Sequence, residues 1–285
     1  MPVSRTIYTQ GAVNLKVSAI NIFSGTITGT NGLFLSGVQS ANFTANSPSQ
    51  DVNSFGVLGS INKVQVEPST ATLEVTLVVN SGNGGADVGW LSGLVSNSQF
   101  PNPSGVVVTA SGIGQVSGAV LTSFRLEASV GNLAQLSLTF DGISGLAQTA
   151  GAAPTTPNAQ TVPVVTPDAF GTLYWNGTSS GCPQTVRASW EMPVERINCL
   201  GNPINSPTIF SRPPGTVSFV AEGVDAQMLT STTFLTGVTI GPYKIAQNSG
   251  SVRETSRTAN MAVGDAAATF NITSEAVALG ATVSG

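Results

Sequence analysis

DVNSFGVLGSINKVQVEPSTATLEVTLVV, residues 51–79, is the stretch of sequence that decides the fold. It opens with a turn-rich run that contains two glycines, and it closes with a segment, 72–77, in which apolar and polar residues alternate. Successive side chains of a β-strand point to opposite faces, so Leu73, Val75 and Leu77 would share one face. One apolar and one polar face are typical of an antiparallel sheet that covers a core. We therefore expect a sheet built around this segment.

The same alternation returns between residues 105 and 143. VVVTA, AVLTSFRLEASV and LAQLSLTFDG read as strands, and Gly131 with Asn132 would form the turn between the last two. Residues 31–46 read as two further short strands joined in a hairpin, and one short helix is expected over 88–95. The pattern predicts an all-β sandwich or barrel with one or two short helices. The core residues predicted for the long hairpin are Leu121, Phe124, Leu126, Leu136, Leu138 and Phe140.

The composition indicates a protein whose surface is covered by other proteins. Hydrophobic residues make up 41% of the 285 residues, but charged residues make up only 8%. Small soluble domains normally carry charged side chains over about a quarter of their surface. We infer that much of this surface contacts copies of the chain or other partners. The alternative is a compact secreted domain that Ser, Thr and Asn side chains solvate.

Charge and hydropathy argue against two kinds of partner. The net charge is −4, and no run of Lys or Arg offers the basic surface of a nucleic-acid binder. The opening MPVSRTIYTQ has no apolar core of signal-peptide length, and no apolar run approaches about twenty residues. We expect folding in a cytoplasm and no membrane-spanning segment. Cys182 and Cys199 would pair only if the fold brought them together, which their spacing does not show, and we interpret them as small space-filling residues.

Residue types that carry catalysis are scarce. The chain has no histidine, which removes the usual general base, the usual serine or cysteine triad and most zinc sites. The closest carboxylate groupings are Glu191 with Glu195 and Glu222 with Asp225, and a glycosidase needs two carboxylates that face each other across a cleft. The glycines of SGIGQVSG lack the strand-to-helix context of a nucleotide-binding loop. We expect no enzymatic activity, no cofactor and no metal site.

A change of composition divides the chain. Residues 149–166 hold its densest Ala, Pro and Thr usage, which favours a linker or a long exposed loop. We expect a first β domain with one short helix over 1–148 and a second β unit over 167–285. NGLFLSG, QSANF, NSFGVLG and ATLEVTLV of the first half have counterparts in the same order, GTLYWNG, QTVRASW, ERINCLG and GTVSFVAE. This order predicts a duplicated β unit, and chance likeness between glycine-rich strands is the alternative.

Three motifs in succession carry a resemblance to a known family. DVNSFGVLGSINKVQVEPSTATLEVTLVV is followed by a small helix around GWLSGLV and by the hairpin LTSFRLEASVGNLAQLSLTFDG. In this order they resemble the tail tube proteins of long-tailed bacteriophages, most clearly over residues 31–145. The resemblance implies a tail-tube β fold whose rings stack into a hollow tube that conducts DNA during ejection. Such rings contain six tube domains, so a ring would need six chains, or three chains that each carry a duplicated unit.

The resemblance also implies a place for charge and a set of partners. A DNA conduit must not hold its cargo, so its lumen should carry acidic or neutral side chains that repel phosphates. The turns between Asn46 and Asp51 and the linker from Thr149 are candidates for contacts between rings. The implied partners are copies of the chain and the tail sheath, baseplate and tail terminator proteins. The implied location is the phage tail of the virion, after synthesis in the host cytoplasm. The lumen-facing candidates are Glu67, Glu74, Glu127 and Asp141.

Two other classes stay open. A different virion shell or decoration protein would share the low charge and the β content, but it would bind a capsid lattice. A β-sandwich adhesin or carbohydrate-binding module would be a stable monomer with an exposed aromatic cluster. Tyr174 and Trp175 are the one adjacent aromatic pair from which such a cluster would be built.

Overall fold

The computed structural model is almost entirely antiparallel β-structure, which confirms the predicted fold class. Among the residues that the structure describes, Leu91 and Val95 have helical backbone, both fall in the predicted helix, and both side chains are buried. The structure describes residues 13–17, 33–35, 37–56, 58–67, 69–79, 91, 95, 106–110, 114–142, 144–147, 170–175, 182–197, 209–211, 215–224, 235–247, 251–261, 268–277 and 281–284. The predicted linker, 149–166, lies outside these residues.

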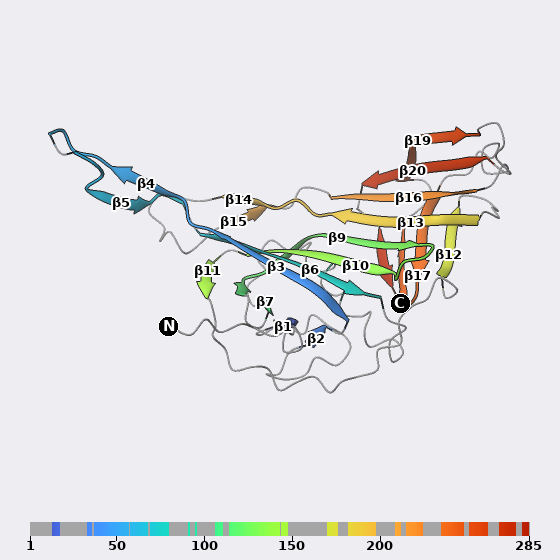
Figure 1. Ribbon diagram of the computed structural model, residues 1–285, viewed down its shortest axis with the longest axis horizontal. Helices are drawn as coiled ribbons and strands as arrows, with labels where there is room; N and C mark the ends of the chain where they lie inside the picture. The colour runs from blue at the N-terminus through green and yellow to red at the C-terminus, as the bar shows by residue number, and fades with distance from the viewer. Residues whose placement is uncertain are drawn as a thin grey trace.

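An eight-stranded sheet dominates the molecule (Figure 1). Its strands are, in spatial order, β19 (Val252–Asn260), β20 (Thr269–Val277), β16 (Thr216–Val224), β13 (Cys182–Glu191), β9 (Val120–Ser129), β10 (Gln135–Gly142), β6 (Thr70–Val78) and β3 (Val38–Asn46). The alternating segment of the sequence lies in β6, where Leu73, Val75 and Leu77 are buried. Every residue predicted for the core of the β9–β10 hairpin is buried as well.

Two smaller sheets pack on the apolar face of the large one. One contains, in spatial order, β11 (Ser144–Ala147), β8 (Gly114–Ser117), β7 (Val106–Ala110), β1 (Val13–Val17) and β2 (Leu33–Leu35). The other contains β12 (Phe170–Trp175), β17 (Leu235–Ile240), β18 (Tyr243–Ala246) and β21 (Thr282–Ser284). The first contacts β6 and β10, and the second contacts β13, β16 and β20. One apolar core runs between the layers.

The hairpin predicted over residues 31–46 is wrong. β2 pairs with β1, whereas β3 pairs with β6 in the large sheet, so the two segments belong to different layers. The chain crosses from one layer to the other at Gly37, whose φ is +72° and where a Cβ would lie 3.0 Å from the carbonyl oxygen of Val78. The glycine therefore does mark a turn, but the turn leads from one sheet to the other and does not close a hairpin.

The strands repeat their spatial order along the chain. Residues 13–147, which we call the N-terminal unit, supply β3-β6-β10-β9, and residues 170–284, the C-terminal unit, supply β13-β16-β20-β19. Each unit contributes four strands to the large sheet. Numbered along the chain, these four strands stand in the spatial order first, second, fourth, third in both units. The smaller sheets repeat in the same way, as β1-β7-β8-β11 and β12-β17-β18-β21.

Two pairs of β-bulges fix how the units correspond. Thr122 of β9 and Thr255 of β19 are each an extra residue in the ladder to the neighbouring strand. The Oγ1 atom of each donates a 3.2 Å hydrogen bond to a threonine carbonyl on that strand, Thr139 in one unit and Thr273 in the other. A bulge inserts one residue and re-aims the strand, so the same bulge in both units marks equivalent positions.

The second bulge lies in the first strand of each unit. Gln39 of β3 is left out of the ladder to β6, and Gln184 of β13 is left out of the ladder to β16. Counted through the ladders, this bulge and the threonine bulge give the same residue-by-residue correspondence. The motifs QSANF and QTVRASW, paired in the sequence, begin at these two glutamines.

Candidate assembly surfaces

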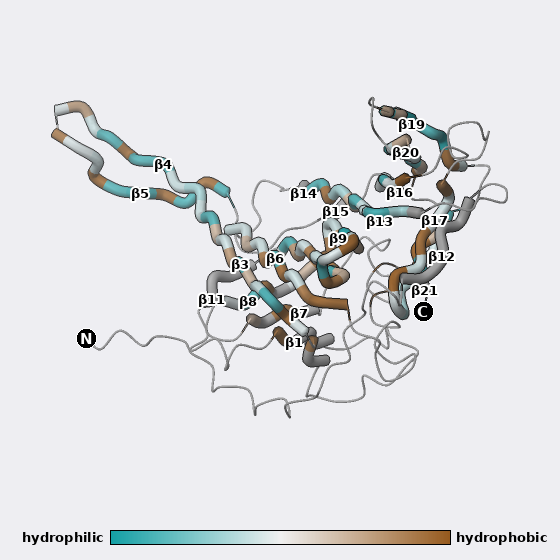
Figure 2. The backbone as a smooth tube through the Cα atoms, turned by 45° about the vertical axis from the view of Figure 1, so that its right-hand side comes forward, coloured by the Kyte–Doolittle hydropathy of each residue, from teal (hydrophilic) through white to brown (hydrophobic). Residues whose placement is uncertain are grey.

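A two-stranded arm projects from one end of the large sheet (Figures 1 and 2). β4 (Ser49–Val52) follows β3, β5 (Asn62–Gln65) leads into β6, and the two strands pair with each other. A 2.9 Å hydrogen bond from the Ile61 N–H to the Val52 carbonyl closes the ladder at the tip side. Gly56 and Gly59 turn the chain at the tip with φ values of 85° and 98°, which other residues rarely adopt.

The arm carries apolar side chains that are exposed to solvent. Phe55 and Leu58 at the tip are fully exposed. Figure 2 shows the hydrophobic colour returning at the far end of the arm, away from the core. Exposed apolar clusters on a soluble chain mark contact surfaces, because their hydration is unfavourable. The exposed apolar residues of the arm are Val52, Phe55, Leu58, Ile61, Val64 and Val66.

The large sheet turns one continuous polar face away from the core. Residues directly opposite each other in a ladder share a face, so the pairings trace this face through all eight strands. Ser, Thr, Asn and Gln make up most of it. The charged residues on the described strands of this face are the carboxylates Glu74, Glu127, Asp141, Glu191, Glu222 and Glu275 and the guanidinium groups of Arg125, Arg187 and Arg253.

Three of the four residues predicted to face a lumen lie on this polar face. Glu74, Glu127 and Asp141 come from β6, β9 and β10, and Asp141 accepts a 2.9 Å hydrogen bond from Thr72 Oγ1. Glu67 does not join them. It is exposed in the connection between β5 and β6, outside the ladder, because β6 begins only at Thr70.

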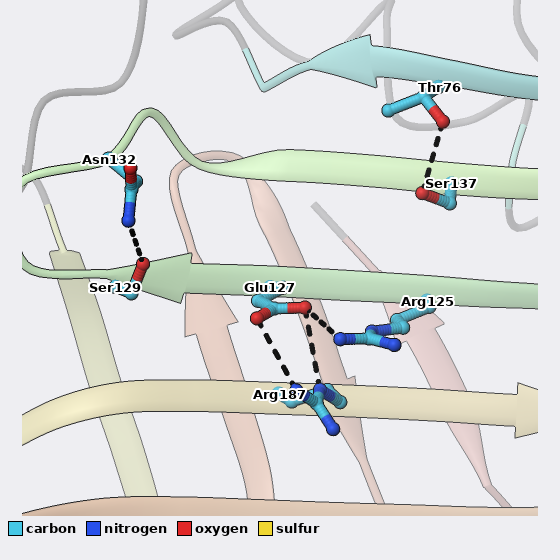
Figure 3. Close-up of polar contacts among 7 residues, drawn as sticks. All are labelled: Thr76, Arg125, Glu127, Ser129, Asn132, Ser137 and Arg187. Atoms are coloured by element: carbon cyan, nitrogen blue, oxygen red, sulfur yellow. Dashed lines mark hydrogen bonds and ion pairs between the residues drawn. The ribbon is translucent and has the colours of Figure 1, made fainter.

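An ionic cluster crosses the boundary between the two units (Figure 3). Arg125 donates a hydrogen bond to Glu127 on the same strand, and Arg187 of β13 lies directly opposite Glu127. The Arg187 Nε atom is 3.4 Å from Glu127 Oε2. Partial burial raises the pKa of Glu127, but the hydrogen bonds and charges of Arg125 and Arg187 outweigh it and leave that pKa below its ordinary value.

The sequence located only part of this cluster. It placed Arg125 and Glu127 two residues apart on the polar side of one strand, and it gave no sign of Arg187, whose approach depends on a pairing between distant strands. The available signal was the alternation of QTVRASW, which puts one arginine on the polar side of a strand. On the other side of the same ladder the rings of Phe124 and Trp190 pack 5.6 Å apart.

β3 and β19 stand at the two ends of the large sheet as far as the structure describes it. Edge strands expose unpaired backbone groups that can pair with another chain. On β19, Glu254 and Arg257 lie on the core side of the sheet, opposite Ser274 and Ile272. The Arg257 Nε atom donates a 2.9 Å hydrogen bond to Glu254 Oε1. Charges turned inward on a bulged edge strand discourage indiscriminate pairing.

Two of the remaining groupings named in the sequence, the cysteine pair and Glu222 with Asp225, extend beyond the described residues. No group of three or more Cys, Asp and Glu residues is placed to hold a metal ion within that part of the chain. Cys199 and Asp225 lie outside it. Among the residues of known placement no helix is long and apolar enough to cross a membrane.

No protein-family model matches the chain, and no curated protein matches it.

Proposed function

We propose that the chain is a structural subunit of a bacteriophage tail tube, which self-assembles into stacked rings around a lumen that conducts DNA. The observation that carries the proposal is the β4–β5 arm, whose tip exposes Phe55 and Leu58 completely. An arm of this kind is stable in water only at a cost in apolar hydration, and a neighbouring subunit that covers it removes that cost. The resemblance to tail tube proteins assigns such projections to contacts between rings.

The polar face of the large sheet supports the second half of the proposal. On its described strands, six carboxylates against three guanidinium groups make it acidic, and Arg125 and Arg187 are engaged with Glu127. Proteins bind DNA where Lys and Arg side chains neutralise its phosphates and release the counterions condensed on them. A face with an excess of carboxylates does not bind DNA in this way, and DNA can slide past it. The tail sheath, baseplate and terminator proteins would meet the outer surface and the tube ends.

Electron microscopy of the purified full chain tests the proposal. Negative-stain images of the protein at micromolar and higher concentrations should show rings or tubes of one fixed diameter. A chain that stays monomeric over this range, as judged by light scattering, would refute it. Binding to a capsid lattice without self-made tubes would instead favour another virion shell or decoration protein, and glycan binding by a monomer would favour an adhesin.

A further inference from the structure

The junction between the two units of one chain is also a template for the junction between two chains. Within the chain, β9, at the end of the N-terminal set, pairs antiparallel with β13, at the start of the C-terminal set. The strands left at the ends of the sheet are β3, the counterpart of β13, and β19, the counterpart of β9. We propose that β19 of one chain pairs with β3 of the next in the register that β9 and β13 use. This proposal rests on the proposed function for the identity of the assembly.

The bulges set that register residue by residue. Arg187 follows the bulge residue Gln184 at the same spacing as Asn42 follows Gln39. Glu127 follows Thr122 at the same spacing as Asn260 follows Thr255. Since Arg187 lies opposite Glu127, Asn42 of one chain lies opposite Asn260 of its neighbour.

The side chains that this register brings together are compatible on both faces. On the polar face the ionic pair is replaced by two amides, which can hydrogen-bond without any charge to desolvate. On the core face, Ala188 opposite Leu126 corresponds to Phe43 opposite the neighbour's Ala259. The large and small partners are exchanged, so each junction pairs one large apolar side chain with one alanine.

The same register covers the free end of β19. Within the chain, Val186 lies opposite Ala128 on the core face. In the proposed junction the corresponding residues are Ala41 and the neighbour's Met261. Met261 is 65% exposed in the single chain and adjoins the last residue of β19. Pairing of β19 with β3 would therefore bury an apolar side chain that the isolated chain leaves in water.

Edge pairing of this kind joins unlike surfaces, so it propagates from chain to chain until the rotation closes a ring. Each chain brings two units, and the six units of a tail tube ring would then come from three chains. The continuous polar face would line the closed ring, and its seams between chains would be uncharged where its seams within chains hold the Arg187–Glu127 cluster.

Disulfide trapping tests the register in the assembled full chain. Hydrogen bonds from Met192 N to Thr122 O and from Val130 N to Gln184 O place Arg187 and Glu127 at a position without ladder hydrogen bonds, where side chains approach closely enough for a disulfide. The pair Asn42→Cys and Asn260→Cys should therefore cross-link on mild oxidation, with a three-chain species predominant on denaturing gels. Each single variant controls for reaction of Cys182 and Cys199.

A second pair separates the register from mere proximity of the edges. Asn42→Cys with Ser256→Cys offers the same thiols at a position displaced by about 13 Å along the strand. More cross-linking of this pair than of Asn42→Cys with Asn260→Cys would overturn the register while leaving the tube proposal intact. Cross-linked three-chain rings that never stack into tubes would keep the junction and overturn the tube. A ladder of four or more chains without a closed species would overturn the three-chain ring.

A backbone substitution serves if the cysteine variants do not fold. Ala259 corresponds to Leu126, whose N–H points across the junction, so Ala259→Pro should leave the fold of the single chain intact and abolish assembly. Thr258→Pro is the matched control, because its N–H points into the sheet toward β20 and its loss should unfold the edge. Normal rings from folded Ala259→Pro protein would overturn the proposed junction.

Discussion

Arg187 of the C-terminal unit lies opposite Glu127 of the N-terminal unit, with its Nε atom 3.4 Å from Glu127 Oε2. Arg125 approaches the same carboxylate from its own strand (Figure 3). The cluster therefore couples the two units on the polar face of the sheet, while Phe124 and Trp190 couple them in the core. Ionic and apolar contacts at one ladder make the boundary between the units a continuous part of the sheet.

Acid should weaken this boundary. The pKa of Glu127 is held below its ordinary value in the folded chain, so the carboxylate contributes stability that is present above the unfolded pKa of about 4.5. That contribution is lost as the pH falls through the lower folded pKa. We expect Glu127→Gln to lower the free energy of unfolding at pH 7 by up to about 1 kcal/mol, a small effect because solvent screens the ion pair. On acidification the variant should lose less stability than the native chain, because it lacks the carboxylate that becomes protonated.

Urea unfolding at several pH values between neutral and 3 measures both effects. Glu67→Gln is the matched control, because it removes one carboxylate outside the sheet. Equal acid sensitivity of the native chain and Glu127→Gln would contradict the role of the cluster.

The faces of β6 can be tested by placing a charge on each. Leu73→Asp or Val75→Asp should prevent folding, because a lone carboxylate buried in the core finds no partner and stays desolvated. Thr76→Asp puts the same group on the polar face of the same strand and should fold. Circular dichroism of the soluble fractions decides between the outcomes. A folded Leu73→Asp chain together with an unfolded Thr76→Asp chain would mean that the faces of the strand are reversed.

Gly114 of β8 lies against the ring of Phe43 of β3, where the two layers pack. A Cβ at this position would lie 2.6 Å from the Cγ atom of Phe43, which packs onto it from β3. Gly114→Ala should therefore cost about 1–3 kcal/mol by overpacking. The smaller Phe43→Leu side chain should recover much of that loss in the double variant, a coupling that a double-mutant cycle of unfolding free energies measures. Strict additivity of the two changes would show that the contact is absent.

The arm should matter to association and not to folding. Phe55→Ser with Leu58→Ser removes apolar groups that are already fully exposed, so the thermal midpoint of the dissociated chain should stay the same. Tube formation should fall sharply, because the same groups lose their burial against a neighbour. Sedimentation and negative-stain images measure the loss. Substitution of the exposed Val130, which lies in the β9–β10 turn away from the arm, is a control that should leave tubes unchanged.

Local periodicity predicted the strands that have one wet face. β6, β9 and β10 were placed from their alternation, and their buried residues were named, since burial of every second side chain leaves a pattern in the sequence itself. The arm was not predicted. Its strands β4 and β5 are exposed on both sides, so no alternation records them, and residues 51–66 read only as a turn-rich run.

The other features that the sequence did not predict depend on pairing between distant strands. Arg187 joins Glu127 only because β13 lies beside β9, and Glu67 leaves the polar face only because β6 begins after it. The counterparts QSANF and QTVRASW indicated a repeat, but the threonine bulges that fix its register involve Thr122 and Thr255, which lie outside the paired motifs and share only a following serine. Sequence patterns thus predict which face of a strand is buried, but they do not predict which strands pair with it.

The β9–β13 ladder has a consequence for how readily rings would form. Two units tied into one polypeptide meet at an effective concentration fixed by the chain, independent of how dilute the protein is. Each free encounter between separate molecules costs about 4–15 kcal/mol of translational and rotational freedom, and a ring of three double units needs two such encounters whereas one of six single units needs five. Covalent linkage of the units would thus lower the critical concentration for closure, so that rings complete while the protein is still scarce in the cell.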